Sequence, residues 1–341
     1  MHQWLICLIL HPENTSHMKY EKHEQKELYE LTKTYLNSPP DDLTVLEKLD
    51  DLRRLIKYHE WRYYNLNDPV ISDPEYDQLF KQLEKLEEEH PDQVTPDSPT
   101  QRVSSDLTEA FPEVEHLTPM LSLANSYNEE DLFDFDQQIK RLLNIDESEH
   151  LEYAVEPKYD GGSIAVIYEN DLLTRGATRG DGIRGEEMTA NAKVIRSIPL
   201  RAAFSEFGIQ KAELRGEVLI RKDNFVKINQ KRAEAGKSLF ANPRNTAAGG
   251  LRMKDPKETA QRNLEAFIYT LGYAANEHGN SVLGEFETHM ESLDLLAKLG
   301  FKVPENGNER KVCKNIKEVV DFCQAWQEKR EDYPYEIDGM V

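Results

Sequence analysis

The stretch Glu156-Pro157-Lys158-Tyr159-Asp160-Gly161 is the part of the sequence from which the fold around it can be predicted. We interpret it as a β-strand, and side chains alternate between the two faces of a strand. Glu156, Lys158 and Asp160 then share one face, so an amine stands between two carboxylates. The Gly161-Gly162 pair at its end lets the backbone approach a ligand closely.

A β-hairpin is predicted directly after this strand. Residues 163–169 and 172–179 have the pattern of strands, and Asn170-Asp171 between them is typical of a tight turn. A two-residue turn and an uninterrupted register set Arg179 opposite Gly162. The hairpin would therefore return an arginine to the lysine strand.

The chemistry of this strand depends on its amine. A lysine amine attacks an electrophile only when neutral, and a reference pKa of about 10.4 leaves on the order of one part in a thousand neutral at pH 7. Burial, a divalent metal or a nearby cation such as Arg179 favours the neutral form, whereas Asp160 opposes it. We therefore interpret Asp160 as a holder of ligand or metal.

The short pattern Lys-x-Asp-Gly is weak evidence by itself. It occurs by chance in roughly one chain in ten of this length, and it is more often a surface turn with a solvated ion pair.

Longer motifs make the comparison specific. They resemble, in the same order, those of bacterial NAD-dependent DNA ligases, which belong to the covalent nucleotidyltransferases together with RNA ligases and capping enzymes. The similarity extends from about Leu43 to the last residue. The motifs are Glu156 to Gly161, Arg175-Gly-Ala-Thr-Arg-Gly-Asp-Gly182, Glu213-Leu-Arg-Gly-Glu-Val218, Leu239-Phe-Ala-Asn-Pro-Arg-Asn245 with Ala247-Ala-Gly249, and Pro334-Tyr-Glu-Ile-Asp-Gly339. The resemblance implies an α+β fold, with a small helical N-terminal module and a nucleotidyltransferase domain of antiparallel sheets flanked by helices.

The resemblance also implies a reaction. Lys158 attacks the AMP phosphorus of NAD, forms a lysyl-AMP phosphoramidate and releases nicotinamide mononucleotide. In the full protein, AMP then passes to a DNA 5′-phosphate and the nick is sealed, in DNA replication and repair. The implied catalytic residues are Lys158, Asp160 and Glu217.

The remaining implied roles concern ligands. Contacts to the AMP half of NAD fall on Glu156 and Tyr269 at the adenine, Arg179 and Glu217 at the ribose, and Ser122 and Leu123 in the pocket wall. Asp160, Glu217 and Asp338 are implied to position Mg²⁺. Arg244, Arg252 and Arg330 are implied to contact the DNA backbone.

Several of these residues have a purely structural alternative. Tyr269 is nearly as well explained as a core tyrosine, Glu217 as half of a surface pair with Arg215, and Ser122-Leu123 as the start of a domain core. Residues 242–257 are predicted to be a loop with a basic cluster, and such clusters are usually solvated. In a chain of net charge −21, however, a local basic patch favours phosphate contact.

A second cluster lies in the predicted helical module. Residues 19–36, a segment opened by the capping box Thr44–Glu47, and a segment from Asp73 to His90 are expected to be helices. Aromatic faces beside acids favour a cationic nicotinamide ring, and in the family this module binds the nicotinamide mononucleotide half of NAD. The alternative, an aromatic stripe that only joins two helices, has equal weight for Tyr63. The cluster comprises Tyr63, Tyr64 (histidine in some relatives), Asp73, Tyr76 and Asp77.

Composition limits the class of protein. The net charge of −21 and a pI near 5.0 indicate a soluble chain without bulk attraction for nucleic acid. There is no apolar run long enough to span a membrane, and the scattered Cys7, Cys313 and Cys323 form neither a disulfide framework nor a zinc site. We expect a cytoplasmic monomer that uses NAD and Mg²⁺, with nicked DNA as partner of the full protein and no membrane partner.

Three segments are predicted. Residues 1–18 are interpreted as a disordered leader of foreign or mis-started origin, 19–110 as the nicotinamide mononucleotide module, and 111–341 as the nucleotidyltransferase domain, cut within its C-terminal motif. The proline-rich residues 92–118 would be a hinge on which the module closes over NAD. The OB-fold, zinc finger and helix-hairpin-helix repeats of a whole ligase are expected beyond residue 341. The chain is therefore predicted to bind NAD but to seal nicks poorly.

Two other functions stay open. An ATP-using ligase or capping enzyme would share the lysine motif but lack the cluster from Tyr63 to Asp77. A non-catalytic DNA-binding scaffold would keep the fold, although the presence of Lys158, Asp160, Arg179 and Glu217 argues against it. The enzymatic hypothesis requires the Lys158 amine to face a pocket that the two modules share.

Overall fold

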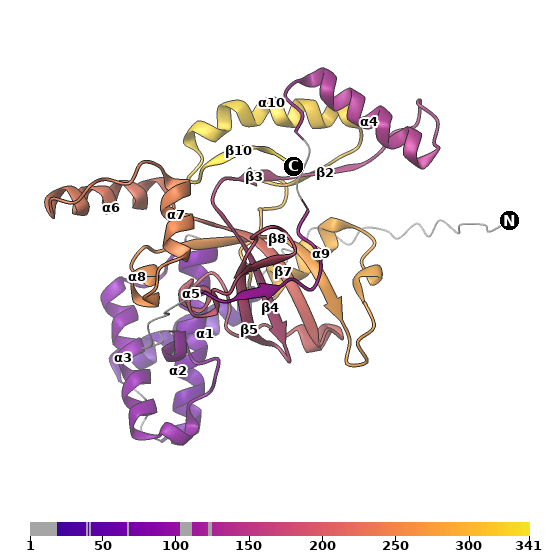
Figure 1. Cartoon of the computed structure of the whole chain (residues 1–341). Coiled ribbons are helices and arrows are strands. Elements are labelled where there is room, and N and C mark those ends of the chain that lie inside the picture. The colour runs from indigo at the N-terminus through magenta and orange to yellow at the C-terminus, as the bar shows by residue number, and fades with distance from the viewer. Residues whose placement is uncertain (1–18, 39, 41, 67, 103–110, 122–124) are drawn as a thin grey trace.

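In a computed structural model of the chain, the described residues are 19–341 except 39, 41, 67, 103–110 and 122–124 (Figure 1). The predictions for residues 1–18, Ser122 and Leu123 lie outside this part.

Three helices form the N-terminal module: α1 (Lys22–Asn37), α2 (Val45–Glu60) and α3 (Asp73–Glu89). Each opens with a capping box, the predicted Thr44–Glu47 pair among them, so backbone N–H groups at the helix start are bonded. α2 continues into a π-helical turn, η1 (Trp61–Asn65). Leucine, tyrosine and tryptophan side chains of these helices form a core of their own. The helix predictions are confirmed, with α1 starting at Lys22 rather than at residue 19.

A four-stranded antiparallel sheet in the order β5-β4-β7-β8 is the centre of the second module. Its strands are β4 (Gly162–Glu169), β5 (Leu172–Thr178), β7 (Lys211–Leu219) and β8 (Glu265–Ala275). Apolar side chains of these strands pack with those of α5 (Thr189–Val194) and α9 (His289–Lys298) in the largest core. The α+β fold class is confirmed.

The hairpin of β4 and β5 exists, but its predicted register is wrong. Pairing starts at Glu169 with Leu172 as a two-residue turn requires, and then shifts by one residue because Thr174 is an extra residue in β5. β5 ends with Thr178 opposite Ile164. Arg179 therefore follows the strand instead of pairing with Gly162.

The turn of this hairpin is fixed by both backbone and side chain. Asn170 and Asp171 have φ of 50° and 69°, the left-handed conformation that a tight hairpin turn requires. The Asp171 carboxylate is buried and accepts hydrogen bonds from Ser205 N (2.8 Å), Ser205 Oγ (2.8 Å) and Arg201 (3.2 Å).

Small antiparallel pairs complete the second module. β3 (Pro157–Tyr159) pairs with β10 (Ile337–Met340), so the predicted lysine strand lies beside the end of the motif Pro334 to Gly339. A separate aromatic core that includes Tyr159, Phe267 and Tyr335 joins this pair to the four-stranded sheet. The other pairs are β2 (Tyr153–Val155) with β9 (Lys311–Cys313), and β1 (Glu113–Glu115) with β6 (Arg184–Glu186). The helices α4 (Glu129–Leu143) and α10 (Ile316–Asp332) pack against each other beside β2 and β9 (Figure 1).

The prediction of a loop over residues 242–257 is wrong. Two helices occupy it, α7 (Pro243–Leu251) and α8 (Pro256–Ala260), next to α6 (Lys222–Glu234). Asn242 and Asp255 each accept a hydrogen bond from the first turn of the following helix, and proline suits the first helical position because it needs no N–H partner there. Residues 184–186 form β6, and α5 starts at Thr189.

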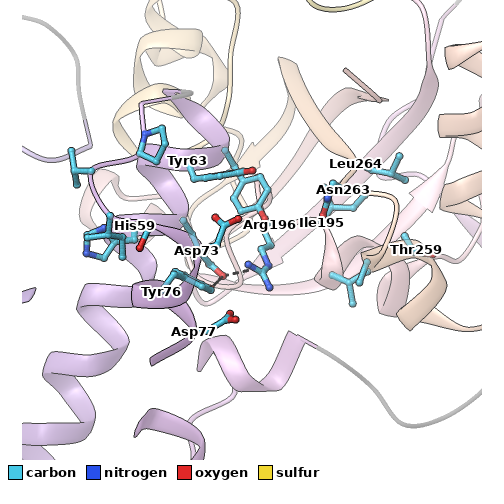
Figure 2. A pocket seen from close by; sticks show the side chains of 18 residues that line it. His59, Tyr63, Asp73, Tyr76, Asp77, Ile195, Arg196, Thr259, Asn263 and Leu264 are labelled. Atoms are coloured by element: carbon cyan, nitrogen blue, oxygen red, sulfur yellow. Dashed lines mark hydrogen bonds and ion pairs between the residues drawn. The ribbon is translucent and has the colours of Figure 1, made fainter. Parts of the chain in front are cut away.

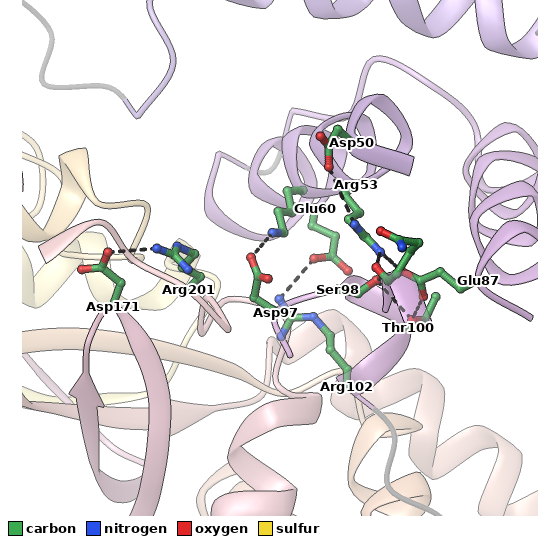
Figure 3. Close-up of polar contacts among 12 residues, drawn as sticks. Asp50, Arg53, Glu60, Glu87, Asp97, Ser98, Thr100, Arg102, Asp171 and Arg201 are labelled. Atoms are coloured by element: carbon green, nitrogen blue, oxygen red, sulfur yellow. Dashed lines mark hydrogen bonds and ion pairs between the residues drawn. The ribbon is translucent and has the colours of Figure 1, made fainter. Parts of the chain in front are cut away.

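The N-terminal module is fastened to the second module by donors that cross their boundary. Arg102, at the end of the turn η3 (Pro99–Arg102), donates to the carbonyl oxygens of Lys193 (2.9 Å) and Ile198 (3.0 Å) and is 3.2 Å from the buried Glu60 carboxylate (Figure 3). Asn65 donates to the Gly300 carbonyl at 2.8 Å.

Lys302 makes a further contact across this boundary. Its buried Nζ donates to the Tyr64 carbonyl oxygen of η1 (2.7 Å) and to Tyr335 Oη (2.8 Å), and it is ion-paired with Glu265. One ammonium thus bonds to both modules and has all three of its N–H groups engaged.

We expect the two turn residues to respond differently to glycine. Asn170→Gly should change the free energy of unfolding by less than about 1 kcal/mol, because relief of left-handed strain offsets one exposed hydrogen bond. Asp171→Gly should lower it by about 2 kcal/mol, because a buried carboxylate and its three hydrogen bonds are lost. Urea denaturation of both variants measures the difference, and equal effects would contradict this role of Asp171.

Candidate functional site

Lys158 lies in β3 opposite Gly339 of β10. Its Nζ is 2.5 Å from Asp338 Oδ2, and the side chain is 36% exposed. Asp338 is the residue at which the β3–β10 register shifts, which sets its carboxylate beside the lysine. An ion pair with a carboxylate stabilises a charged amine. In this arrangement the amine is therefore engaged by the Asp338 carboxylate.

Asp160 lies just beyond β3 and pairs with a different cation. Its Oδ1 is 2.9 Å from Arg244 in α7, and its backbone N–H donates to the Glu336 carbonyl at 3.0 Å. A residue predicted to hold ligand or metal is thus next to a residue predicted to contact phosphate.

Glu217 reaches the same region from β7. It is buried and accepts a hydrogen bond from Ser163 Oγ at 2.8 Å. Burial raises the pKa of Glu217 to about 7, although Ser163, the Gly161 N–H and the Arg244 charge act to lower it. The carboxyl group is therefore partly protonated near neutral pH.

Gly161 allows β3 and β7 to meet at this point. A Cβ atom there would lie 2.2 Å from the Val218 carbonyl oxygen. This distance is too short for any residue with a side chain. The close approach of the two strands brings Asp160 and Glu217 into one site.

Glu156, at the other end of β3, has a buried oxygen without a hydrogen bond. Oε2 finds no donor among the described residues, and His289 Nε2 lies 3.6 Å away. A buried acceptor without a partner is rare in a folded protein, so this oxygen can accept from a ligand amine. Tyr269 of β8 is half-buried, and burial raises its pKa. Arg179 is exposed directly after β5.

The three predicted metal ligands do not form a metal cage. In the described part of the chain, no group of three or more histidine, cysteine, aspartate and glutamate side chains is arranged to hold an ion. The carboxylates of Asp160, Glu217 and Asp338 instead contact Arg244, Ser163 and Lys158. Their role with Mg²⁺ stays a prediction.

The predicted basic residues lie on different elements. Arg244 belongs to α7 and Arg252 ends it, with side chains 59% and 57% exposed. Arg252 pairs with Glu186 at 2.7 Å. Arg330 lies in α10.

A cavity of about 370 Å³ lies between the two modules (Figure 2). Asp73 and Asp77 are one turn apart on α3, so both point to one side of it. The ring centroids of Tyr63 and Tyr64 are 4.7 Å apart in η1. All five predicted residues line the cavity: Tyr63, Tyr64, Asp73, Tyr76 and Asp77.

Sequence reasoning missed other residues of this cavity. Glu60 accepts a hydrogen bond from Tyr76 Oη at 3.1 Å. It is buried three residues before Tyr63 on a continuous helix, a spacing that could have indicated it. Arg196, Thr259 and Asn263 form the facing wall from the second module, and no sequence pattern connects them with the tyrosines.

The two sites are separate in this arrangement. Lys158, Glu217 and Asp338 are not among the described residues that line the cavity between the modules. Figure 1 shows β3 and β10 on one side of the four-stranded sheet and α1 to α3 on the other. The hypothesis from the sequence required the amine to face a pocket shared by the modules. In this arrangement it does not.

Comparison with known proteins supplies a further finding. Residues 108–341 match the family model described as NAD-dependent DNA ligase adenylation domain. Residues 43–104 match the model described as DNA ligase-like, N-terminal NAD+-binding domain.

None of the described helices is long and apolar enough to cross a membrane.

Proteins named DNA ligase are similar over most of the chain. That of Sulfurihydrogenibium azorense is 54% identical over 94% of this chain and 46% of its own length. The Persephonella marina protein is 56% identical over 86% of this chain and 40% of its own length. The Aquifex aeolicus protein is 50% identical over 94% of this chain and 44% of its own length. The chain spans less than half the length of these curated relatives.

The raised pKa of Glu217 predicts a dependence of stability on pH. Between about pH 4.5 and 7 the folded protein binds more protons at Glu217 than the unfolded chain does, so its contribution to stability falls as pH rises. The loss is at most about 3 kcal/mol. Glu217→Gln should remove it, so the variant should gain stability relative to the unmodified protein from about pH 5 to about pH 8. Urea denaturation at both pH values tests this, and a difference that does not change with pH would contradict it.

Proposed function

The chain belongs to the family of NAD-dependent DNA ligases, and on that premise we propose that it carries out their adenylation step. The Lys158 amine attacks the phosphorus of the AMP half of NAD. A phosphoramidate bond forms, the phosphoanhydride bond breaks, and nicotinamide mononucleotide leaves with its phosphate. The amine attacks in its neutral form, so one proton leaves it for solvent beforehand and a second leaves the nitrogen as the phosphoramidate forms.

The observation that carries this proposal is the convergence around Lys158. The Lys158 amine on β3 is reachable from solvent. Asp160, which follows β3, pairs with Arg244 of α7, and Glu217 lies on β7. Arg244 supplies positive charge for a phosphate, and the partly protonated Glu217 can donate to or accept from a ribose hydroxyl. Two ion pairs and a buried carboxyl thus come from β3, β10, α7 and β7 to one region of the module.

The AMP half of NAD would lie along β3. We assign the adenine amine to the unpartnered oxygen of Glu156, with Tyr269 as a stacking surface and Arg179 and Glu217 at the ribose. Ser122 and Leu123 keep the role that the family resemblance implies.

The family resemblance implies that Mg²⁺ assists this reaction. The described residues, however, offer no direct ligand set for it.

The nicotinamide half of NAD would bind in the cavity between the modules. A planar cationic ring fits between tyrosine faces with carboxylates beside it, and Tyr63, Tyr64, Tyr76, Asp73 and Asp77 supply both. In the present arrangement Lys158 does not line this cavity, and Figure 1 shows β3 and α1 to α3 on different sides of the sheet. We therefore propose that the N-terminal module moves over the β3 site when NAD binds.

The later steps of the family reaction would use DNA. Arg244 and Arg252 present exposed guanidinium groups on α7, and Arg330 lies on α10. We propose that they contact the backbone of nicked DNA in the complete protein, in which AMP passes to the 5′-phosphate and the nick is sealed.

Intact-mass measurement after incubation with NAD and Mg²⁺ tests the central step. The unmodified chain should gain the mass of one AMP, and Lys158→Ala should gain none, because the attacking amine is absent. Incubation with ATP should give no adduct. An adduct on Lys158→Ala, or adenylation by ATP instead of NAD, would contradict the assignment.

The nicotinamide site makes a separate prediction. Tyr63→Ala should slow adenylation at low NAD concentration by roughly tenfold, because a stacking and cation–π surface is lost. Tyr29→Ala serves as a control, since Tyr29 lies in the same module but does not line the cavity. Rates measured by mass spectrometry compare the two, and equal slowing would indicate damage to the module.

A further inference from the structure

Arg196 enters the cavity from the second module. It lies two residues after Val194, the last residue of α5, and it is the cation among the described residues of the wall that faces the tyrosines. Figure 2 shows its guanidinium group extending toward Tyr76 across the boundary between the modules. Its side chain is 38% exposed, so it is accessible from the cavity.

The contacts of Arg196 are those of a bound organic cation. Its Cζ lies 5.3 Å from the ring centroid of Tyr76 and 5.7 Å from that of Tyr64, within the range of cation–π attraction. Its Nε is 3.9 Å from Glu60 Oε1, and that carboxylate is buried and also bonded to Tyr76 and Arg102. A flat, delocalised positive charge thus lies over two aromatic faces with a carboxylate beside it.

Electrostatics at this position favour a cation. Burial alone would lower the pKa of Arg196, but the neighbouring Tyr76, Tyr64 and Glu60 more than compensate, so that its pKa is raised. The phenols are uncharged at neutral pH because their own pKa values are raised, so the buried Glu60 carboxylate is the neighbour that attracts the guanidinium charge there.

We propose that Arg196 is an internal competitor for the nicotinamide ring. The guanidinium group occupies the cation position between Tyr64 and Tyr76 while the modules lie as described, and it must leave before the oxidised ring can bind there. Its departure also removes a contact between the modules, so ligand entry and release of the N-terminal module are coupled. The inference rests on the proposed nicotinamide site and adds a regulatory element to it.

The alternative is that Arg196 binds the phosphate of nicotinamide mononucleotide. Its position argues against this, because Glu60 stands beside the guanidinium group and Asp73 and Asp77 line the same cavity. These carboxylates would repel a phosphate. The two readings predict opposite effects of removing the charge.

Calorimetric titration of nicotinamide mononucleotide into the whole chain tests the proposal. Arg196→Gln should bind it more tightly than the unmodified protein, by roughly tenfold for the loss of two ring contacts and a charge. Arg196→Lys keeps a cation that is less suited to stacking, so its affinity should fall between the two. Arg54→Gln is the charge-matched control, because Arg54 is 65% exposed on α2 and outside the cavity, and it should not change binding.

Unchanged or weaker binding by Arg196→Gln would overturn the proposal, and weaker binding would assign Arg196 to the phosphate. Thermal unfolding of each variant shows whether it is folded. If Arg196→Gln is not folded, the affinity of Arg196→Lys for nicotinamide mononucleotide still tests the proposal. No binding by either the unmodified chain or Arg196→Gln would refute the proposed nicotinamide site itself. If Tyr63→Ala abolishes binding and Arg196→Gln leaves it unchanged, the nicotinamide site stands and only the competitor role of Arg196 is overturned.

Discussion

The pairing of β3 with β10 is the constraint on which the rest of the site depends. It joins residues about 180 positions apart in the chain, Lys158 and Asp338 among them. The shared aromatic core beneath the pair fixes it to the four-stranded sheet. Because β7 passes close to Gly161, the same pairing also brings Glu217 toward Asp160. Lys158, Glu217 and the Asp160–Arg244 pair therefore owe their placement in large part to this strand pair and its approach to β7.

The polar groups of both sites are satisfied by the protein's own side chains. Lys158 contacts Asp338, Asp160 contacts Arg244, and Arg196 lies over Tyr64 and Tyr76. A ligand that enters must exchange these contacts for its own, so binding gains only the difference between the two sets. Such pre-paired sites keep charges from being buried alone before the ligand arrives. Glu156 Oε2 and His59 Nδ1 are exceptions, since each is buried without a hydrogen-bond partner in the described structure.

Much of this could be predicted from local sequence, and the failures have physical causes. Capping boxes and alternating strands depend on neighbours along the chain, so α2, α3 and the β4–β5 hairpin were found. The extra residue Thr174 was not, because a bulge is determined by the partner strand. The helix α7 was missed where Asn242 and Pro243 start a helix rather than a loop. Arg196 could not be found at all, since its partners are on another module. The residue roles assigned by resemblance stay predictions.

Lys302 has a consequence for how the two modules can part. Its buried ammonium keeps a counter-ion, Glu265, and a phenol, Tyr335, within its own module, and only its third N–H reaches the Tyr64 carbonyl. When the modules separate here, Lys302 loses one neutral acceptor, the Tyr64 carbonyl oxygen, but keeps its ion pair with Glu265. Water can fill that vacancy, so the joint can open without stranding an isolated ion in a low-dielectric interior.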